Sequence, residues 1–198
     1  RDEIVRFLIG GYGTTSLALT YAWYELARNP ETWRRLTDEL DETIAGDRPT
    51  PAEVRRLEVT ERVVTETLRK YPPIYAVFRE STSDVTFGDW TIPGGSLICL
   101  PQFVLHRDER FYDAPETFRP ERWADDLEDT LPEYAYFPFG GGPRHCIGMR
   151  FGMTEMKIVI SMLAQRFRFE PAYDSLPETN VALTLQPKDS VDMYARPR

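Results

Sequence analysis

The chain has 198 residues, of which 41% are hydrophobic, so it holds enough apolar material for the core of one large domain. Its formal net charge of −8 argues against nucleic acid as a partner, because phosphate binding requires clustered lysine and arginine. No apolar run is long enough to cross a bilayer, no signal peptide opens the chain, and two cysteines are too few for a disulfide framework. We therefore expect a cytoplasmic protein without a membrane segment in this chain.

Residues 2–29 have apolar positions at a loosely helical spacing, and Pro30 ends this helix because the residue before a proline avoids the α region. Gly10, Gly11 and Gly13 lie inside it, at a cost of roughly 1 kcal/mol each against alanine. We expect a local distortion or a closely approaching ligand there. The alternative, a dinucleotide-binding turn, fails because residues 31–40 predict a second helix where that fold needs a strand.

Two further helices are predicted over residues 51–57 and 60–70, the first with Thr50 as its N-cap. Glu66 and Arg69 lie three residues apart and share one face of the second helix. An isolated surface pair would contribute only about 0.5 kcal/mol. The apolar neighbours of this pair leave few solvated positions on the helix, so we expect the pair to face inward.

The pattern changes to a period of two over residues 85–87, 90–92 and 96–100, which predicts a small antiparallel sheet. An acidic stretch, residues 125–133, indicates a solvated loop, and residues 148–167 indicate a long helix. Residues 181–185 and 191–194 predict a closing hairpin. The expected class is mainly α with small antiparallel β-sheets (α+β), in one domain without an internal boundary.

Cys146 lies at the end of a glycine-rich loop, close to Arg144 and just before the predicted helix over 148–167. A neighbouring arginine and a helix start both favour a thiolate, while a structural cysteine is an equally acceptable interpretation of the loop alone. Zinc and iron–sulfur sites usually need four Cys or His ligands at paired spacings. The chain offers only four such residues and no C-x-x-C motif, so a single axial thiolate remains, as in haem-thiolate proteins. The four residues are Cys99, His106, His145 and Cys146.

This loop resembles the haem-binding loop of the cytochrome P-450 family, with the pattern F-x-x-G-x-R-x-C-x-G. The matching residues are Phe139, Gly142, Arg144, Cys146 and Gly148. Glu66-x-x-Arg69 resembles the E-x-x-R helix of that family, residues 118–123 resemble its P-E-R-F/W segment, and residues 10–15 resemble its oxygen-binding groove. All these motifs follow the family order, so the resemblance covers essentially the whole chain.

The resemblance implies that residues 1–198 are the C-terminal portion of one cytochrome P-450 domain, whose N-terminal half is absent from this chain. It implies haem b with Cys146 as the iron ligand, and Phe139 near the sulfur. Other residues that it assigns to cofactor binding are Arg144, Gly140, Gly148 and Arg79. It also implies a buried network of Glu66, Arg69 and Arg122, an oxygen site at Thr14 and Gly11, a substrate-contacting segment at residues 74–78, and a structural role for His106.

The implied activity is a monooxygenase that inserts one oxygen atom from O2 into a small apolar substrate. Electrons would come from a ferredoxin or a flavoprotein reductase, because the chain has no flavin or iron–sulfur motif. Gly13 occupies the position of the usual acid in the family pattern, which predicts altered oxygen activation with proton delivery through water. Two alternatives stay open: a truncated, non-catalytic remnant and a peroxide-driven oxygenase. Retention of Thr14 weighs against peroxide chemistry.

Overall fold

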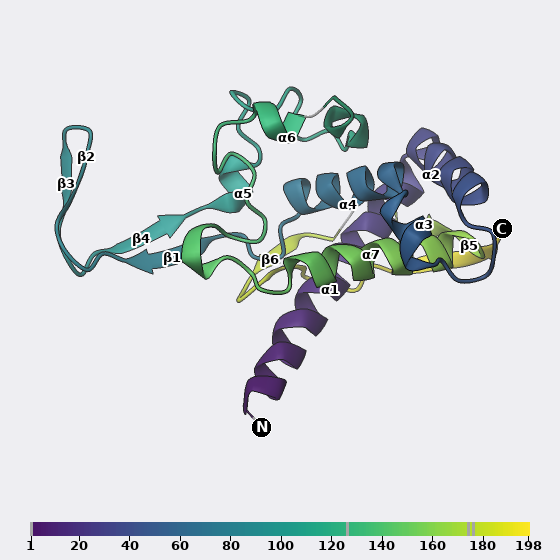
Figure 1. The fold of residues 1–198 in the computed structure, drawn as a ribbon, viewed down its shortest axis with the longest axis horizontal. Coiled ribbons are helices and arrows are strands. Elements are labelled where there is room, and N and C mark those ends of the chain that lie inside the picture. The colour runs from purple at the N-terminus through teal and green to yellow at the C-terminus, as the bar shows by residue number, and fades with distance from the viewer. Residues whose placement is uncertain (1, 126, 174, 176) are drawn as a thin grey trace.

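The computed structural model describes residues 2–125, 127–173, 175 and 177–198, and these residues are mainly helical with small two-stranded antiparallel sheets (Figure 1). The helices are α1 (Asp2–Arg28), α2 (Pro30–Thr43), α3 (Pro51–Arg55), α4 (Glu58–Lys70), α5 (Gln102–Leu105), α6 (Leu127–Thr130) and α7 (Met149–Ala164), with 3₁₀ turns η1 (Pro120–Trp123) and η2 (Gly142–Arg144). The strands are β1 (Val77–Glu80), β2 (Val85–Phe87), β3 (Trp90–Ile92), β4 (Leu97–Leu100), β5 (Phe167–Pro171), β6 (Thr179–Val181), β7 (Leu185–Pro187) and β8 (Met193–Pro197). The expected fold class is confirmed.

Local sequence signals predict most helix boundaries to within a few residues. Asn29, before Pro30, separates α1 from α2. Thr50 caps α3 through a capping box, in which its hydroxyl accepts the Glu53 N–H at 3.3 Å and the Glu53 carboxylate accepts the Thr50 N–H at 2.7 Å. The acidic stretch predicted as a loop contains the short helix α6, and Asp126 lies outside the described residues.

The helix α1 runs without interruption through Gly10, Gly11 and Gly13. Of the two alternatives predicted at these glycines, a local distortion is wrong, and a closely approaching ligand stays a prediction. A Cβ added at any of the three positions would meet no atom within 4 Å. The missing side chains thus leave open space beside a regular helix.

One hydrophobic core packs the C-terminal half of α1 against α2, α4 and α7. Ala18, Ala22 and Leu26 recur every four residues on α1 and are at most 2% exposed, so this face of the helix points inward. The α7 residues at the same spacing face the same core. The core members contributed by the other elements include Leu36, Leu40, Leu57, Val63, Leu68, Met156, Ile160 and Ala164.

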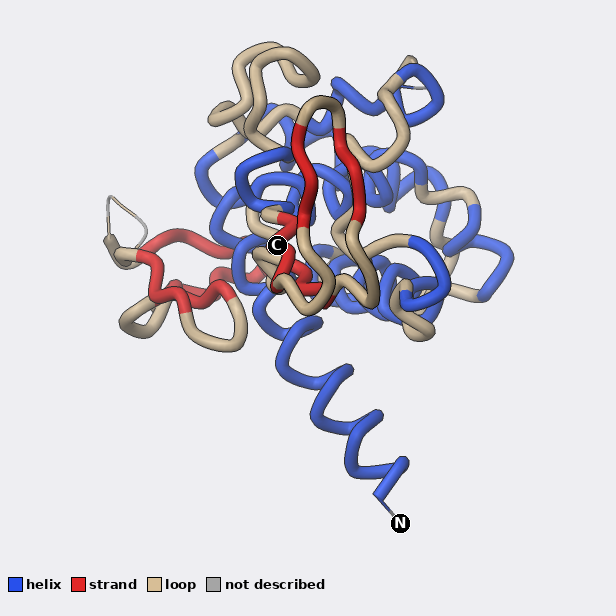
Figure 2. The backbone as a smooth tube through the Cα atoms, turned by 90° about the vertical axis from the view of Figure 1, so that its left-hand side faces the viewer, coloured by secondary structure: helices blue, strands red, loops and turns tan. Residues whose placement is uncertain are grey.

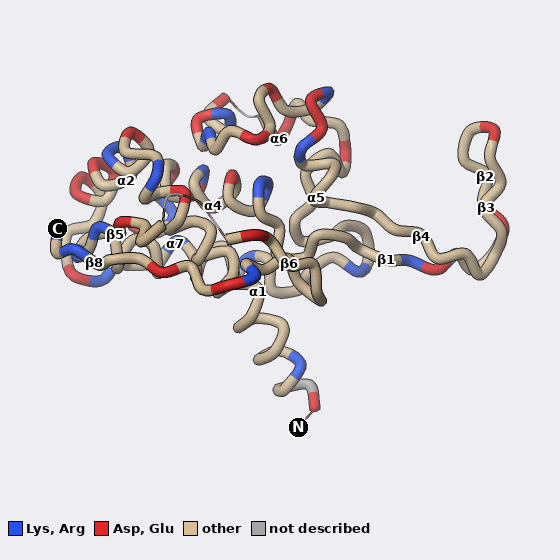
Figure 3. The backbone as a smooth tube through the Cα atoms, turned by 180° about the vertical axis from the view of Figure 1, so that it is seen from behind, with Lys and Arg blue, Asp and Glu red and all other residues tan. Residues whose placement is uncertain are grey.

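The first half of α1 projects away from this core (Figures 1 and 2). The helical spacing predicts Ile4, Phe7 and Leu8 on the same face as Trp23 and Leu26, but the first three are 62–65% exposed and only the last two are buried. Few charged residues lie along this half of the helix (Figure 3). Within the described ranges, every helix is too short or too polar to cross a membrane.

The strand pairing departs from the local prediction in two places. β2 and β3 form the predicted hairpin, with Gly88 at a φ of 58° in the turn. β4 does not join this hairpin, because it pairs with β1, with Cys99 opposite Phe78. The predicted closing hairpin is also wrong, since β6 pairs with β7 while β8 pairs with the distant strand β5.

Candidate functional site

A tight glycine turn presents Cys146 ahead of α7. The Cys146 N–H donates to the Phe139 carbonyl at 2.8 Å, and the Gly140 N–H donates to the Phe137 carbonyl at 2.9 Å, so residues 137–146 fold back on themselves. The chain then passes Gly148, the N-cap of α7. We call residues 137–148 the thiolate loop. Its geometry leaves Cys146 as an exposed free thiol close to a helix N-terminus.

Two glycines of the thiolate loop adopt a backbone conformation that other residues rarely adopt. Gly140 has a φ of 73° and Gly142 has a φ of 66°, both in the left-handed region. The turn that positions Cys146 therefore depends on glycine at these two positions.

We expect Gly140→Ala to lower the free energy of unfolding by about 1–2 kcal/mol, because an L side chain in the left-handed region crowds its own backbone. Urea unfolding of the full-length protein, followed by circular dichroism, measures the change. Gly46→Ala is the matched control, since Gly46 lies in an exposed bend, has no positive φ, and has no atom within 4 Å of an added Cβ. Equal losses in the two variants would contradict this expectation.

The surroundings of the Cys146 sulfur suit a flat apolar group held by one thiolate. Ile147 and Phe151 follow it with 84% and 73% of their surfaces exposed, which leaves uncovered apolar area close to the thiol. Gly148 has no side chain to fill this space, and an added Cβ would lie 3.7 Å from the Cys146 Sγ. No group of three or more His, Cys, Asp or Glu side chains in the described part of the chain could hold a metal ion. A single axial thiolate of the haem-thiolate type fits these residues.

The other residues predicted to contact a cofactor lie on separate elements. Arg144 ends η2 and is exposed. Arg79 lies on β1 opposite Ile98, and its guanidinium donates to the Phe78 carbonyl at 2.9 Å. Phe139 is half-buried and packs against the hydrophobic core. The roles of these three residues toward a cofactor stay predictions.

Glu66 is the centre of a buried ion network. It forms two hydrogen bonds of 2.9 Å with Arg69, and both residues are 0% exposed. The Arg122 Nε donates to the same carboxylate at 3.0 Å, and so do the Arg119 N–H at 3.0 Å and the Trp123 indole at 2.8 Å. The carboxylate is therefore fully hydrogen-bonded, which the burial of these charges requires.

The remaining hydrogen bonds of Arg69 tie this network to backbone carbonyls. Arg69 donates to His106 O and to Pro115 O, at 2.7 Å each. Burial lowers the pKa of the Arg122 guanidinium, and the Glu66 charge opposes that change. Among the described residues, no hydrogen bond of this network reaches the thiolate loop directly. Any support that the network gives to Cys146 must pass through intermediate residues.

Thr14 and Gly11, the residues predicted for an oxygen site, lie on α1. The Thr14 hydroxyl donates to the Gly10 carbonyl at 2.7 Å, one helical turn earlier. Gly11 is exposed, and Gly13 lies between the two predicted residues with open space beside it. The roles of Thr14 and Gly11 stay predictions.

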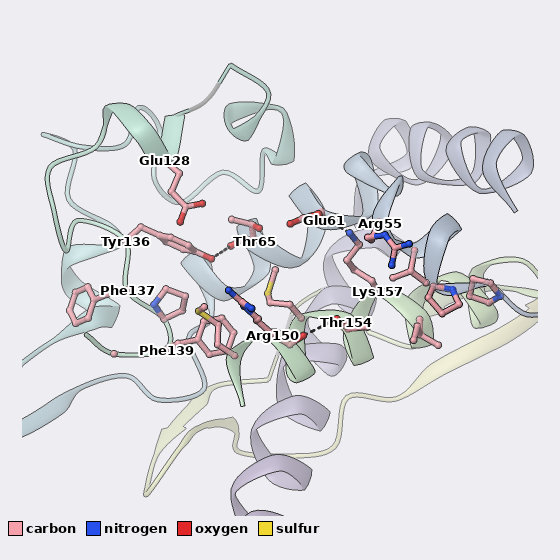
Figure 4. Close-up of a pocket in the computed structure, with 18 residues that line it drawn as sticks. Arg55, Glu61, Thr65, Glu128, Tyr136, Phe137, Phe139, Arg150, Thr154 and Lys157 are labelled. Carbon is pink, nitrogen blue, oxygen red and sulfur yellow. Dashed lines mark hydrogen bonds and ion pairs between the residues drawn. The ribbon is translucent and has the colours of Figure 1, made fainter. Parts of the chain in front are cut away.

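A groove of about 720 Å³ runs between α4, α7 and the start of the thiolate loop (Figure 4). Glu61 and Lys157 form an ion pair of 2.7 Å within its lining, and the Tyr136 hydroxyl donates to the Thr65 carbonyl at 3.1 Å. Cys146 is not among the residues that line this groove. The groove nevertheless shares Phe139 and Gly140 with the thiolate loop.

Two polar residues hold the thiolate loop; the resemblance implied a structural role for His106, whereas Gln102 received no role from the sequence. His106 and Gln102 are both 0% exposed, and both form hydrogen bonds with the backbone of Phe137. The sequence carries one signal for this pair: Gln102 and His106 lie four residues apart with three apolar residues between them, which would place both side chains on one face of a helix.

Comparison with known proteins identifies the family and the relatives to which this chain is similar. The sequence model of the family Cytochrome P-450 matches residues 1–192. Cyclooctatin synthase of Streptomyces melanosporofaciens is 36% identical over 99% of the chain and 41% of its own length. Cytochrome P-450 3A29 of Sus scrofa is 39% identical over 97% of the chain and 39% of its own length. Cytochrome P-450 4d2 of Drosophila melanogaster is 35% identical over 100% of the chain and 40% of its own length. The chain spans about two fifths of the length of these relatives.

Proposed function

The chain belongs to the cytochrome P-450 family, and we propose that it is the thiolate-bearing C-terminal portion of a single haem-thiolate monooxygenase domain. The observation that carries the proposal is the exposed Cys146 thiol, on a glycine turn and beside uncovered apolar side chains. Because the chain spans about two fifths of its relatives, the activity is proposed for the full-length protein.

When bound, haem b would supply the activation of O2: with two electrons from the redox partner and two protons, one oxygen atom would enter a small apolar substrate and the other would leave as water. Cys146 would hold the iron, and Phe139 would lie near the sulfur. The glycines of the loop let the backbone approach the macrocycle closely, because no Cβ intervenes. Residues proposed to contact the macrocycle or its propionates are Gly140, Gly148, Arg144 and Arg79.

Thr14 is proposed to handle a proton at its Oγ1. The hydroxyl donates to the Gly10 carbonyl at 2.7 Å, and an added Cβ at Gly11 or Gly13 would meet no atom within 4 Å, so the space beside the helix there is open. The family pattern places an acid where this chain has Gly13, so protons would reach Thr14 through ordered water.

We expect Gly13→Glu to raise coupling, the ratio of product formed to reductant consumed, several-fold in the full-length protein, because a general acid then replaces water as the proton source. The added side chain meets no atom within 4 Å of its Cβ, so the helix accommodates it. Gly13→Gln is the matched control, since it has the same shape but no acidic proton. The proton-relay interpretation fails if both variants, or neither, change the coupling.

The proposed partners are an electron-donating ferredoxin or flavoprotein reductase and a small apolar organic substrate. Cys99 and Cys146 are both free thiols, which favours the cytoplasm as the location.

Isotopically labelled dioxygen tests the proposed reaction against its two alternatives. The full-length protein, an electron donor and a panel of small apolar compounds should yield a product that carries one labelled oxygen atom. A peroxide-driven oxygenase would incorporate label from labelled peroxide only. A non-catalytic remnant would form no product from either oxidant. Label from peroxide alone, or no product, would contradict the proposal.

A further inference from the structure

Two side chains at α5 hold both backbone hydrogen-bonding groups of one residue in the thiolate loop. Gln102 and His106 lie four residues apart and are 0% exposed. The Phe137 N–H donates to His106 Nε2 at 3.0 Å, and Gln102 Nε2 donates to the Phe137 carbonyl. The His106 ring also meets the Phe137 ring edge-on, with 5.5 Å between centroids. The backbone of Phe137 is therefore clamped on both sides of its Cα, at its N–H and at its carbonyl.

Phe137 begins the turn that leads to the thiol. Its carbonyl also accepts the Gly140 N–H at 2.9 Å, and the next hydrogen bond of the loop joins Cys146 N–H to the Phe139 carbonyl at 2.8 Å. A rotation of the peptide between Phe137 and Pro138 would break the first of these bonds. By holding the Phe137 carbonyl and the N–H that precedes it, Gln102 and His106 fix the start of the turn that presents Cys146.

Holding Phe137 with polar side chains leaves a buried polar atom without a hydrogen bond within the residues that the structure describes, which apolar side chains in the same space would not do. Gln102 Oε1 is buried without a hydrogen-bond partner among the described residues. Burial lowers the pKa of His106 to about 3, so the ring stays neutral near physiological pH and its Nε2 remains an acceptor. Unsatisfied buried atoms are rare in folded proteins, and they are tolerated mainly where a particular geometry is needed for function.

We propose that Gln102 and His106 are positioning residues for the Cys146 thiolate, which clamp the backbone of Phe137 and join it to the buried ion network. The connection is short, because Arg69 of that network donates to the His106 carbonyl at 2.7 Å. The network thereby acts on the thiolate loop, with which it shares no direct hydrogen bond in the described chain. The role toward a thiolate rests on the proposed haem-thiolate function, whereas the clamp is a property of the polypeptide.

Amide hydrogen exchange in the full-length protein tests the clamp without reference to haem. His106→Leu removes the acceptor, and we expect the Phe137 and Gly140 amides to exchange about tenfold faster than in the wild type, as for one lost hydrogen bond. His106→Gln keeps a side-chain acceptor near the position of Nε2, so it should restore most of the protection. Unchanged exchange in His106→Leu, or equal acceleration in His106→Gln, would overturn the clamp.

The absorbance spectrum of the reduced, carbon monoxide-bound protein tests the positioning role. We expect His106→Leu and Gln102→Met to move a fraction of the protein from the red-shifted thiolate band to the thiol-type band, and His106→Gln to reverse the change. Leu40→Ala, a buried change on α2 away from the loop, controls for general destabilisation and should keep the red-shifted band. The same spectral change in Leu40→Ala, at a matched loss of stability, would overturn the positioning role.

The two measurements separate this inference from the function on which it rests. If the wild type lacks the red-shifted band while the exchange results hold, the haem-thiolate function is wrong and the clamp remains as a feature of the fold. If the wild type has the band and neither His106→Leu nor Gln102→Met alters it, the function stands and the positioning role is wrong.

Discussion

Cys146→Ser in the full-length protein is expected to abolish the red-shifted absorbance band of the reduced, carbon monoxide-bound form and to lower monooxygenase activity to background. That band requires a thiolate on the iron, and the Cys146 sulfur lies exposed at the end of the glycine turn. A serine hydroxyl fits the same space but does not ionise at neutral pH, so it cannot supply the same electron density. The spectrum of the purified, dithionite-reduced variant under carbon monoxide measures the loss.

Cys99→Ser is the matched control for this substitution. Cys99 is the other free, exposed thiol of the chain, but it lies on β4 opposite Phe78 and outside the thiolate loop. We expect Cys99→Ser to keep both the red-shifted band and the activity. Survival of the band in Cys146→Ser, or its loss in Cys99→Ser, would refute the assignment of Cys146 as the iron ligand.

Glu66→Gln is expected to lower the free energy of unfolding by about 3–5 kcal/mol, because it leaves the buried charges of Arg69 and Arg122 without a counter-ion. The glutamine amide also presents donors to groups that are themselves donors, including the Trp123 indole at 2.8 Å. A loss of this size is a large fraction of the roughly 5–15 kcal/mol by which folded domains are stable. Urea unfolding of the full-length protein, monitored by circular dichroism and tryptophan fluorescence, measures it.

Glu58→Gln, on the same helix, controls for the loss of one negative charge. Glu58 pairs with Arg62 at 3.4 Å, but its side chain is 77% exposed, so the substitution should cost less than about 1 kcal/mol. If Glu66→Gln cost no more than Glu58→Gln, the buried network would not stabilise the fold in the way that its hydrogen bonds indicate.

Features that depend on neighbouring residues could be predicted from the sequence. The N-cap at Thr50, the break at Pro30 and the pairing of residues 85–87 with 90–92 each follow from residues a few positions apart. Glu66 and Arg69 face the same side of α4 because three residues make almost one helical turn. The loop before Cys146 was predicted from its glycines, and Gly140 adopts a φ of 73° in it.

Pairings between distant segments were the part that sequence reasoning missed. β4 pairs with β1 and β8 pairs with β5, and in neither case does a short turn specify the partner. The backbone N–H and C=O groups at the edge of a strand form hydrogen bonds with whichever strand the packing of the helices brings beside them. The exposure of the first half of α1 also could not be predicted from the sequence, because an apolar helix face is buried only where another element packs against it.

The sequence by itself determined which residues are candidates for the chemistry. Counting the Cys and His residues left a single thiolate as the predicted ligand, and the resemblance of the loop with Gly142, Arg144 and Gly148 to a haem-binding loop implied Cys146. Only the tertiary structure decided how that thiol is held. Gln102 and His106 meet Phe137 across more than thirty residues of chain, and a hydrogen bond over such a separation depends on the packed position of α5, which no local pattern encodes.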